Sequence, residues 1–182
     1  MIFHASEIDG VFVVEPEPIR DERGFFARVW SSDEFEARGL AANLVQLSIS
    51  FNRSKHTLRG MHWQDEPHGE AKLVRCVRGS IYDVVADLRP ESASFGQWRA
   101  FRLTDANRRA LYVPPLVAHG FQTLADETEI AYAMSANHEP AAARGFRWDD
   151  PGFAIDWPDA PARIMSERDR TWPDLSIFAP QN

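Results

Sequence analysis

Three side chains that can move a proton or stabilise a negative charge lie close together in the middle of the sequence. Arg59 and His62 are three residues apart, and Lys72 follows ten residues later, at the start of an apolar segment. An imidazole titrates near neutral pH and can act as a base. A lysine directed into an apolar interior is costly unless it serves a ligand or an opposite charge. The trio indicates acid–base chemistry on a bound ligand, with an exposed strand-end lysine as the structural alternative for Lys72.

Three further residues could join this group, although each alone has a simpler structural interpretation. His119 lies in an apolar setting, Tyr132 lies in a segment whose alternate residues are apolar, and Asp169 follows a polar stretch near the end. Taken singly, a satisfied structural histidine, a core tyrosine and a surface carboxylate are the more common outcomes. Only their combination with His62 and Lys72 would make them functional.

The sequence offers weaker support for metal or nucleophilic chemistry. The second position after His62 is Gln64, an amide and a poor ligand, so the chain lacks a His-x-His pair there. It also lacks a His-Glu-x-x-His motif, a Gly-x-Ser-x-Gly motif and a glycine-rich phosphate loop. We therefore predict an activity that needs neither a metal nor a cofactor.

The elements that must position these residues are predicted to be short β-strands. Apolar residues alternate over short segments separated by turn residues, and Arg78-Gly79 is typical of a tight hairpin between two of them. Such spacing favours a barrel or sandwich. The predicted strands are Val11–Val14, Gly24–Trp30, Asn43–Phe51, Leu58–Trp63, Lys72–Val77, Ile81–Leu88, Trp98–Leu103, Ala110–Val113, Gly120–Leu124 and Glu129–Ser135.

Little helix is expected. Ser31 and Glu34 form a capping-box pattern and Gly39 stands at a suitable stop, which predicts a helix of about two turns on the outside. After Asn137, repeated prolines predict short helical turns and loops that wrap the barrel. We expect a single domain over residues 1–182, with the barrel core at about 10–136 and a wrapping segment at about 137–182.

Composition narrows the classes of partner. Twenty Lys and Arg oppose 27 Asp and Glu, giving a formal charge of −7, which disfavours nucleic acid as a partner. No stretch approaches the roughly 18 apolar residues of a membrane span, and the first residues do not resemble a secretory signal. The single cysteine, Cys76, is expected to be a small buried residue and suits a reducing compartment. We expect a cytoplasmic protein.

Several blocks of the sequence, spread from about residue 10 to residue 175, together resemble the dTDP-4-dehydrorhamnose 3,5-epimerase family. Their number and spacing make the resemblance highly specific. The blocks are Asp21–Phe26, Leu58–Gln64, Lys72–Val74, Asp83-Val84, Asp87–Pro90, Ala118–Phe121, Tyr132, Trp148–Pro151, Trp157-Pro158 and Ser166–Asp169.

The resemblance implies a cupin-type double-stranded β-helix, or jelly roll, usually a homodimer. It implies epimerisation at C3 and C5 of dTDP-4-dehydro-6-deoxyglucose to dTDP-4-dehydrorhamnose, without a metal. In that reaction His62 is the base, Asp169 holds its imidazole, Lys72 stabilises the enolate and Tyr132 returns a proton from the opposite face. The residues implied to contact the nucleotide sugar are Arg23, Phe26, Gln46, Arg59, His119 and Arg168, with residues 23–28 reaching into the partner subunit.

Four positions depart from the family pattern, and three of them leave the nucleotide and the sugar open. Arg28 and Ala143 stand where the family often has glutamates, and Gln46-Leu47-Ser48 replaces a Gln-Asp-Asn run. Leu116 stands where a turn glycine is usual. An epimerase acting at C3 alone and a sugar-binding cupin without catalysis remain alternatives, and a metal-dependent cupin oxygenase is a weaker one.

Overall fold

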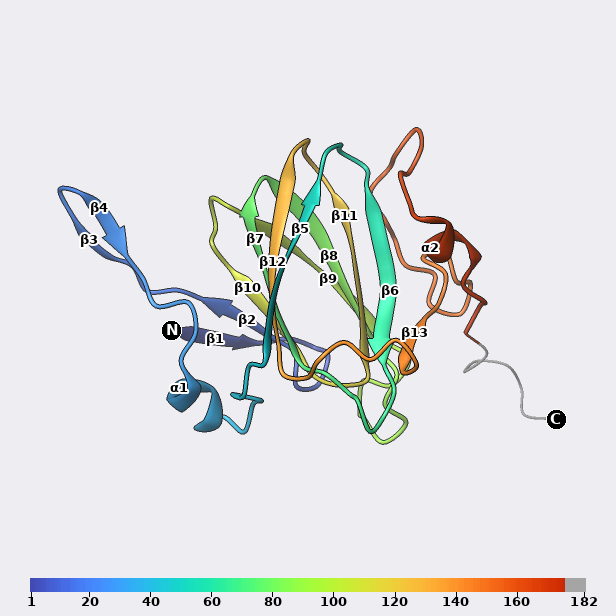
Figure 1. Cartoon of the computed structure of the whole chain (residues 1–182), viewed down its shortest axis with the longest axis horizontal. Helices are drawn as coiled ribbons and strands as arrows, with labels where there is room; N and C mark the ends of the chain where they lie inside the picture. Colours follow the sequence, from blue (N-terminus) through green and yellow to red (C-terminus); the bar gives the residue numbers. More distant parts are fainter. Residues whose placement is uncertain (176–182) are drawn as a thin grey trace.

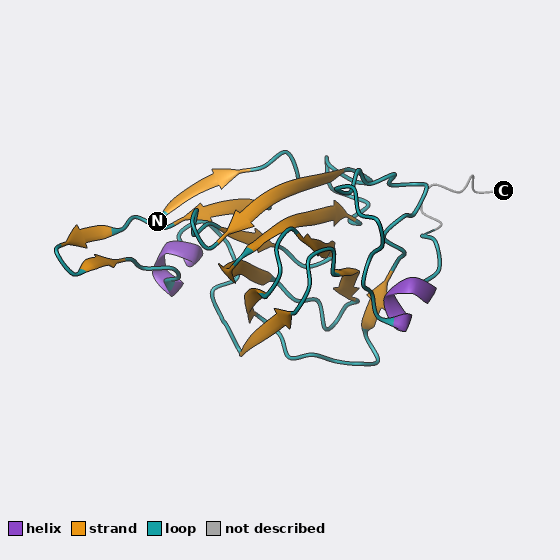
Figure 2. Ribbon diagram, turned by 90° about the horizontal axis from the view of Figure 1, so that it is seen from above, coloured by secondary structure: helices purple, strands orange, loops and turns teal. Residues whose placement is uncertain are grey.

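The structure, a computed structural model, describes residues 1–175 and is a cupin-type jelly roll in which two antiparallel sheets enclose a core (Figures 1 and 2). The predicted all-β fold is confirmed. One sheet has the strand order β1 (Ile2–Ala5), β2 (Phe12–Glu15), β10 (Ala110–Val113), β7 (Lys72–Arg78), β12 (Thr128–Met134) and β5 (Gln46–Asn52). The other has the order β13 (Ala143–Gly145), β6 (Leu58–Gln64), β11 (Val117–Thr123), β8 (Ser80–Asp87) and β9 (Trp98–Thr104).

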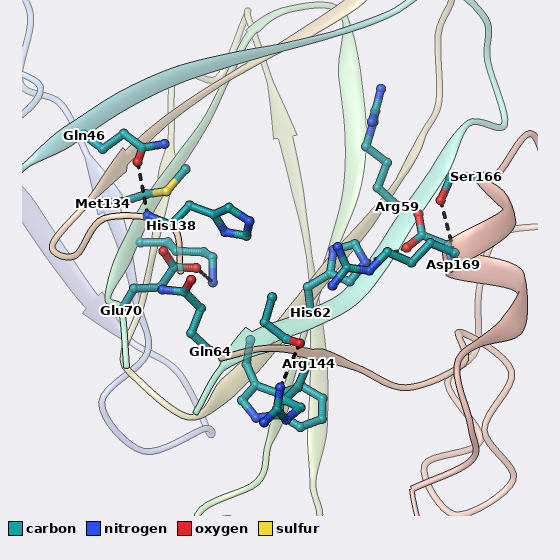
Figure 3. Close-up of a pocket in the computed structure, with 14 residues that line it drawn as sticks. Gln46, Arg59, His62, Gln64, Glu70, Met134, His138, Arg144, Ser166 and Asp169 are labelled. Carbon is teal, nitrogen blue, oxygen red and sulfur yellow. Dashed lines mark hydrogen bonds and ion pairs between the residues drawn. The ribbon is translucent and has the colours of Figure 1, made fainter. Parts of the chain in front are cut away.

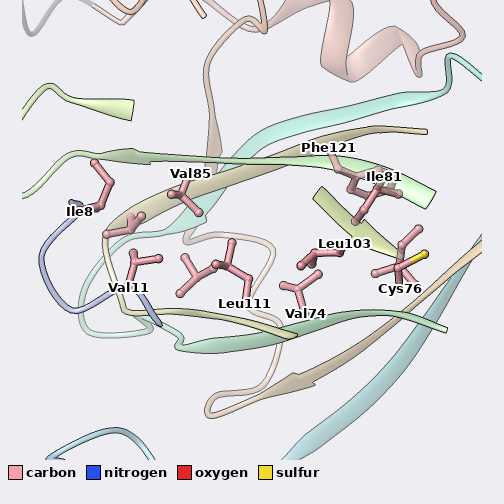
Figure 4. Packing of buried hydrophobic residues seen from close by; sticks show 12 residues of the cluster. Ile8, Val11, Val74, Cys76, Ile81, Val85, Leu103, Leu111 and Phe121 are labelled. Atoms are coloured by element: carbon pink, nitrogen blue, oxygen red, sulfur yellow. The ribbon is translucent and has the colours of Figure 1, made fainter. Parts of the chain in front are cut away.

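Alternation of side chains along the strands builds the core between the two sheets. Val74 and Cys76 of β7, Val85 of β8 and Leu111 of β10 meet in one buried cluster (Figure 4). The prediction that Cys76 is a small buried residue is confirmed. At one end of the barrel, polar side chains replace this apolar filling, and the cavity described below lies there.

The predicted boundaries were wrong at several places. Strand β11 begins at Val117, three residues before the predicted start, so His119 lies inside a strand. Helix α1 (Ser32–Glu36) is shorter than predicted, and the Ser31 side chain makes no capping hydrogen bond. The carboxylate of Glu34 accepts instead from the amino group of Met1, at 3.0 Å, and pairs with Arg28. A capping box fails here because a tertiary ion pair takes its glutamate.

The predicted strand at Gly24–Trp30 is also different in the structure. It is reduced to β4 (Gly24–Phe26), which pairs with β3 (Ile19–Asp21) in a two-stranded hairpin. Figure 1 shows this hairpin projecting away from the barrel. Ile19 and Phe26 are each 74% exposed on it. Among the described residues, the hairpin therefore keeps much of its apolar surface uncovered.

The segment after β13 packs on the outside of the five-stranded sheet. Phe146, Phe153 and Trp157 share a buried cluster with Leu58 and Met61 of β6. The same segment contains helix α2 (Glu167–Thr171), which lies beside β6 in Figure 1. Residues 176–182 of the predicted wrapping segment lie outside the described residues. No helix within residues 1–175 has the length and apolar character needed to cross a membrane.

A buried carboxylate ties the end of β8 to the N-terminal segment. Asp87 accepts hydrogen bonds from Arg89, Ser92 and Ser94, while Arg89 also donates to the carbonyl oxygen of Asp9. Burial by itself would raise the pKa of Asp87, but hydrogen bonds from Arg89, Ser92 and Ser94 lower it to about 2. The charged form of Asp87 is thus favoured by folding.

We predict that Asp87→Asn lowers the free energy of unfolding at pH 7 by about 1.5–3 kcal/mol, because hydrogen bonds to a charged acceptor are lost. In the unchanged protein, Asp87 stabilises the fold above the unfolded-state pKa of about 3.9, and this contribution is lost as the pH falls towards 2. Urea unfolding at pH 7 and pH 3 measures both effects. The exposed control Asp159→Asn should unfold like the wild type, and an Asp87→Asn protein as stable as this control would refute the assignment.

Candidate active site

A polar cavity opens between the two sheets at one end of the barrel. It consists of two chambers of about 350 and 300 Å³, whose linings share five residues. These residues come from both sheets and from α2, so the cavity is assembled from segments far apart in the sequence (Figure 3). The shared residues are Arg59, His62, Lys72, Met134 and Asp169.

A close approach of β6 and β11 sets the two histidines of the cavity side by side. His62 and His119 are direct partners in the antiparallel pairing of these strands. A Cβ atom on Gly60 would lie 2.5 Å from the Cα atom of Gly120, and Gly60 has a φ of +121°. Glycine at both positions is therefore needed for the strands to come together beside the histidines.

His62 is held by a carboxylate from the wrapping segment. Its Nε2 atom lies 2.5 Å from Oδ1 of Asp169, which is buried on α2. Although burial opposes ionisation of Asp169, the hydrogen bond with His62 and the charge of that imidazole keep the pKa of Asp169 below its usual value. The prediction that Asp169 lies at the imidazole is therefore matched by the geometry, and the surface interpretation of this residue was wrong.

Packing of a tryptophan against a glycine seats the helix that carries Asp169. The Trp172 ring follows α2 and lies so close to Gly145 of β13 that a Cβ atom there would be 2.4 Å from it. Trp172 also contacts the His62 ring edge-on, with ring centroids 6.4 Å apart. Gly145 pairs with His62 across β13 and β6, so one small residue lets helix and base come together.

Lys72 is buried and paired. It is 8% exposed, and its Nζ atom lies 2.7 Å from Oε1 of Glu70, which is equally buried. Lys72, Met134 and Gln46 lie in one row across β7, β12 and β5 and line the same chamber. The alternative of an exposed strand-end lysine was wrong, because the start of β7 lies inside the barrel mouth.

A second histidine–carboxylate pair lies deeper. The Nε2 atom of His119 is 2.7 Å from Oδ1 of Asp83, a residue of β8 with no exposed surface. This complete burial raises the pKa of Asp83, although the adjacent imidazole opposes the shift. His119 lines the same chamber as His62, so the cavity holds two imidazoles, each with a carboxylate behind it.

Tyr132 faces the histidines from the opposite wall. It lies on β12 in the six-stranded sheet, whereas His62 and His119 lie on β6 and β11 in the five-stranded sheet. Burial raises its pKa, the Asp83 charge raises it further, and the positive charge of Arg59 opposes the shift. The phenol is therefore protonated at neutral pH and can donate a proton into the cavity.

The predicted sugar-contact residues fall into two groups. Gln46, Arg59 and Arg168 line the cavity, and the Arg168 guanidinium lies 4.8 Å from the centroid of the Trp172 ring. Arg23 and Phe26, in contrast, lie on the projecting hairpin and line neither chamber of their own chain. Arg23 is exposed and bonds only with Asp21 among the described residues.

Sequence reasoning missed several residues in and behind the lining of the cavity. The signal for Asp83 was present, because it alternates with Ile81 and Val85 on the face of a strand directed into the core. Glu70 carried a weaker signal, an acid two residues before the candidate lysine. Other lining residues without a predicted role in the site include Ile49, Ser50, Met134, His138 and Arg144.

The side chain of Gln64 makes hydrogen bonds to the backbone of neighbouring loops. Its amide nitrogen donates to the carbonyl oxygens of His68 and Asn137, and its amide oxygen accepts from the backbone nitrogen of Glu139. Within residues 1–175, no three side chains of His, Cys, Asp or Glu are placed to share one metal ion. One wall of the cavity carries the imidazoles of His62 and His119, and the other carries the ammonium group of Lys72 and the phenol of Tyr132.

Comparisons with known proteins agree with this geometry. Residues 5–176 match the family model described as dTDP-4-dehydrorhamnose 3,5-epimerase. The chain is 41% identical to an enzyme of that name from Methanothermobacter thermautotrophicus, covering 95% of this chain and 94% of the relative. It is 40% identical to a dTDP-4-dehydrorhamnose 3-epimerase of Streptomyces niveus, covering 90% and 78%. A Bacillus anthracis 3,5-epimerase crystallised with TDP and pyrophosphate superposes with a TM-score of 0.91 at 34% identity, covering 96% and 99%.

Proposed function

The chain belongs to the dTDP-4-dehydrorhamnose 3,5-epimerase family, and we propose that its cavity inverts C3 and C5 of dTDP-4-dehydro-6-deoxyglucose to give dTDP-4-dehydrorhamnose. The protein is an isomerase, and the single observation that carries the mechanism is the placement of His62 and Tyr132 on opposite walls of one chamber. Inversion requires that a proton leave one face of a carbon and return to the other.

In the first half of the proposed reaction, His62 acts as the base. A proton next to a ketone is weakly acidic, so its removal requires that the developing oxyanion be stabilised. Lys72 and His119 line the same chamber as His62 and can donate hydrogen bonds to the C4 oxygen. Asp169 fixes the orientation of the His62 ring and stabilises the imidazolium that forms.

In the second half of the proposed reaction, Tyr132 acts as the acid. Its protonated phenol faces the plane of the enolate from the wall opposite His62, so a proton given by Tyr132 arrives on the face that His62 did not use. The same pair can act at C5 once the ring is reoriented, because C3 and C5 both neighbour the C4 ketone. This account requires no cofactor or metal, and the absence of both stays a prediction.

We propose further that the protein acts as a homodimer through the outer face of β5. Along this strand the polar Gln46, Ser48 and Ser50 face the barrel, and the apolar residues face outwards. Leu47 is 77% and Ile49 is 68% exposed, beside a largely apolar groove that Trp30 and Ala131 also line. A strand with its apolar side turned to solvent on a sheet edge is suited to contact with another chain.

The hairpin supports the same proposal. Phe26 is exposed far from its own cavity, and Arg23 at the turn carries a cation suited to a phosphate. In a dimer, the hairpin of one subunit would place both residues at the cavity of the other, where the family resemblance implies a contact with the nucleotide sugar.

We also propose a single domain over residues 1–182 and a cytoplasmic location. The wrapping segment shares one apolar cluster with β6, which supports a single folding unit. The one cysteine, Cys76, is buried and free, as suits a reducing compartment.

We predict that His62→Ala and Tyr132→Phe each lower turnover by about 10²–10⁴-fold but affect solvent exchange differently. His62→Ala removes the base and should abolish deuterium exchange at C3. Tyr132→Phe should retain some exchange while blocking inversion, because the proton can return only to the face it left. Proton NMR of the substrate in D2O measures both. The exposed histidine of the control His68→Ala should be dispensable, and rapid exchange by His62→Ala would show that another group is the base.

We predict that the wild type sediments as a dimer and that Leu47→Glu, which charges the outer face of β5, produces monomers with little activity. Analytical ultracentrifugation and the turnover assay measure the two effects. Ile164→Glu makes the same kind of change at an exposed position on the wrapping segment and should leave the dimer intact. A stable, fully active wild-type monomer would contradict the proposal.

A further inference from the structure

Glu70 brings a second, uncommitted acceptor into the cavity. Its Oε1 atom pairs with Lys72 at 2.7 Å, whereas its Oε2 atom is buried and has no hydrogen-bond partner among the described residues. The side chain is 8% exposed and lines the chamber that His62, Lys72 and Asp169 also line (Figure 3). The proposed reaction of His62 and Tyr132 does not use this carboxylate.

A buried carboxylate oxygen without a donor is unfavourable, because the oxygen has lost water and gained nothing in return. The pairing of Lys72 with Oε1 fixes the carboxylate and leaves Oε2 as the oxygen of this lining residue that still lacks a donor. A ligand that supplies a hydroxyl or amide hydrogen would satisfy this oxygen, whereas a phosphate would be repelled by its charge. Arg59 and Arg168 are the cations of the lining suited to phosphate.

We propose that Glu70 accepts a hydrogen bond from the C3 hydroxyl of the sugar and is thereby a specificity-determining residue. The inference rests on the proposed function, in which Lys72 binds the C4 oxygen. Because Glu70 touches Lys72, a sugar whose C4 oxygen is bound by Lys72 would bring an atom next to C4 towards the free oxygen of Glu70. Of the two neighbouring carbons, C3 carries a hydroxyl, which is a donor, and C5 carries a methyl group and the ring oxygen, which are not.

This contact would also orient the ring. With the hydroxyl of C3 on the side of Glu70, C5 and its methyl group lie on the other side of the Lys72 contact. A reversed ring would bring a methyl group against a charged, desolvated oxygen, which is unfavourable. Glu70 would thus select sugars that bear a hydroxyl beside the ketone position and reject those that lack it.

The test compares the binding of two nucleotide sugars that the enzyme cannot turn over, because both lack the ketone. The probes are dTDP-6-deoxyglucose and its 3-deoxy analogue, and the measurement is isothermal titration calorimetry on the full chain. The wild type should bind the 3-hydroxy sugar about ten- to a hundredfold more tightly, the range expected for a hydrogen bond to a charged group. Glu70→Ala should bind the two sugars within about twofold of one another.

Taking the ratio of the two affinities separates Glu70 from Lys72, since any disturbance of Lys72 affects both sugars alike. Glu70→Gln keeps the side-chain volume and replaces the charged acceptor with an amide. Its affinity ratio should fall between those of the wild type and Glu70→Ala. This variant also controls for a folding defect in Glu70→Ala. Glu91→Ala, at an exposed glutamate outside the lining, should keep the wild-type ratio. A wild-type ratio retained in Glu70→Ala and Glu70→Gln would overturn the inference. Deuterium exchange by the wild type into the keto sugar tests the proposed function separately.

Discussion

The site depends on the pairing of each buried ionisable side chain with a partner that stabilises its charge or holds its proton. Moving an unpaired ion out of water costs several kcal/mol, so a barrel interior tolerates ionisable side chains only in compensated sets. Here His62 lies against Asp169, Lys72 against Glu70, and His119 against Asp83. These three pairs come from different strands and from α2. The site can therefore form only when the barrel has folded and α2 has packed against it. The strands that contribute are β6, β7, β8 and β11.

The same constraint explains what could be predicted from the sequence and what could not. Strand alternation and turn residues identify most of the barrel, and the motif around His62 together with Lys72 identifies the cavity. Asp169 could not be placed by pattern, because its burial depends on a five-residue helix that docks through Trp172 and Gly145, more than 25 residues away from each other in the chain. Only the family resemblance pointed to it. Glu70 escaped notice because an acid two residues away from a lysine in a sequence is usually exposed to solvent.

Strand β5 shows a second way in which function overrides the usual pattern. A strand of a two-sheet jelly roll normally turns its apolar side inwards, yet here Gln46 and Ser48 face the cavity and Leu47 and Ile49 are largely exposed. Alternation alone identifies the strand but does not say which face is inside. A polar cavity on one side and a partner subunit on the other would together account for this reversed polarity of β5. The site and the proposed dimer are thus linked through one strand.

The central claim is that one base and one acid on opposite walls invert both carbons beside the ketone. Its most direct test is proton NMR of wild-type enzyme with dTDP-4-dehydro-6-deoxyglucose in D2O. The account predicts deuterium at C3 and at C5 of the product, together with inversion at both carbons. Deuterium at C3 alone would contradict the double epimerisation, and no deuterium at either position would contradict the proposed substrate.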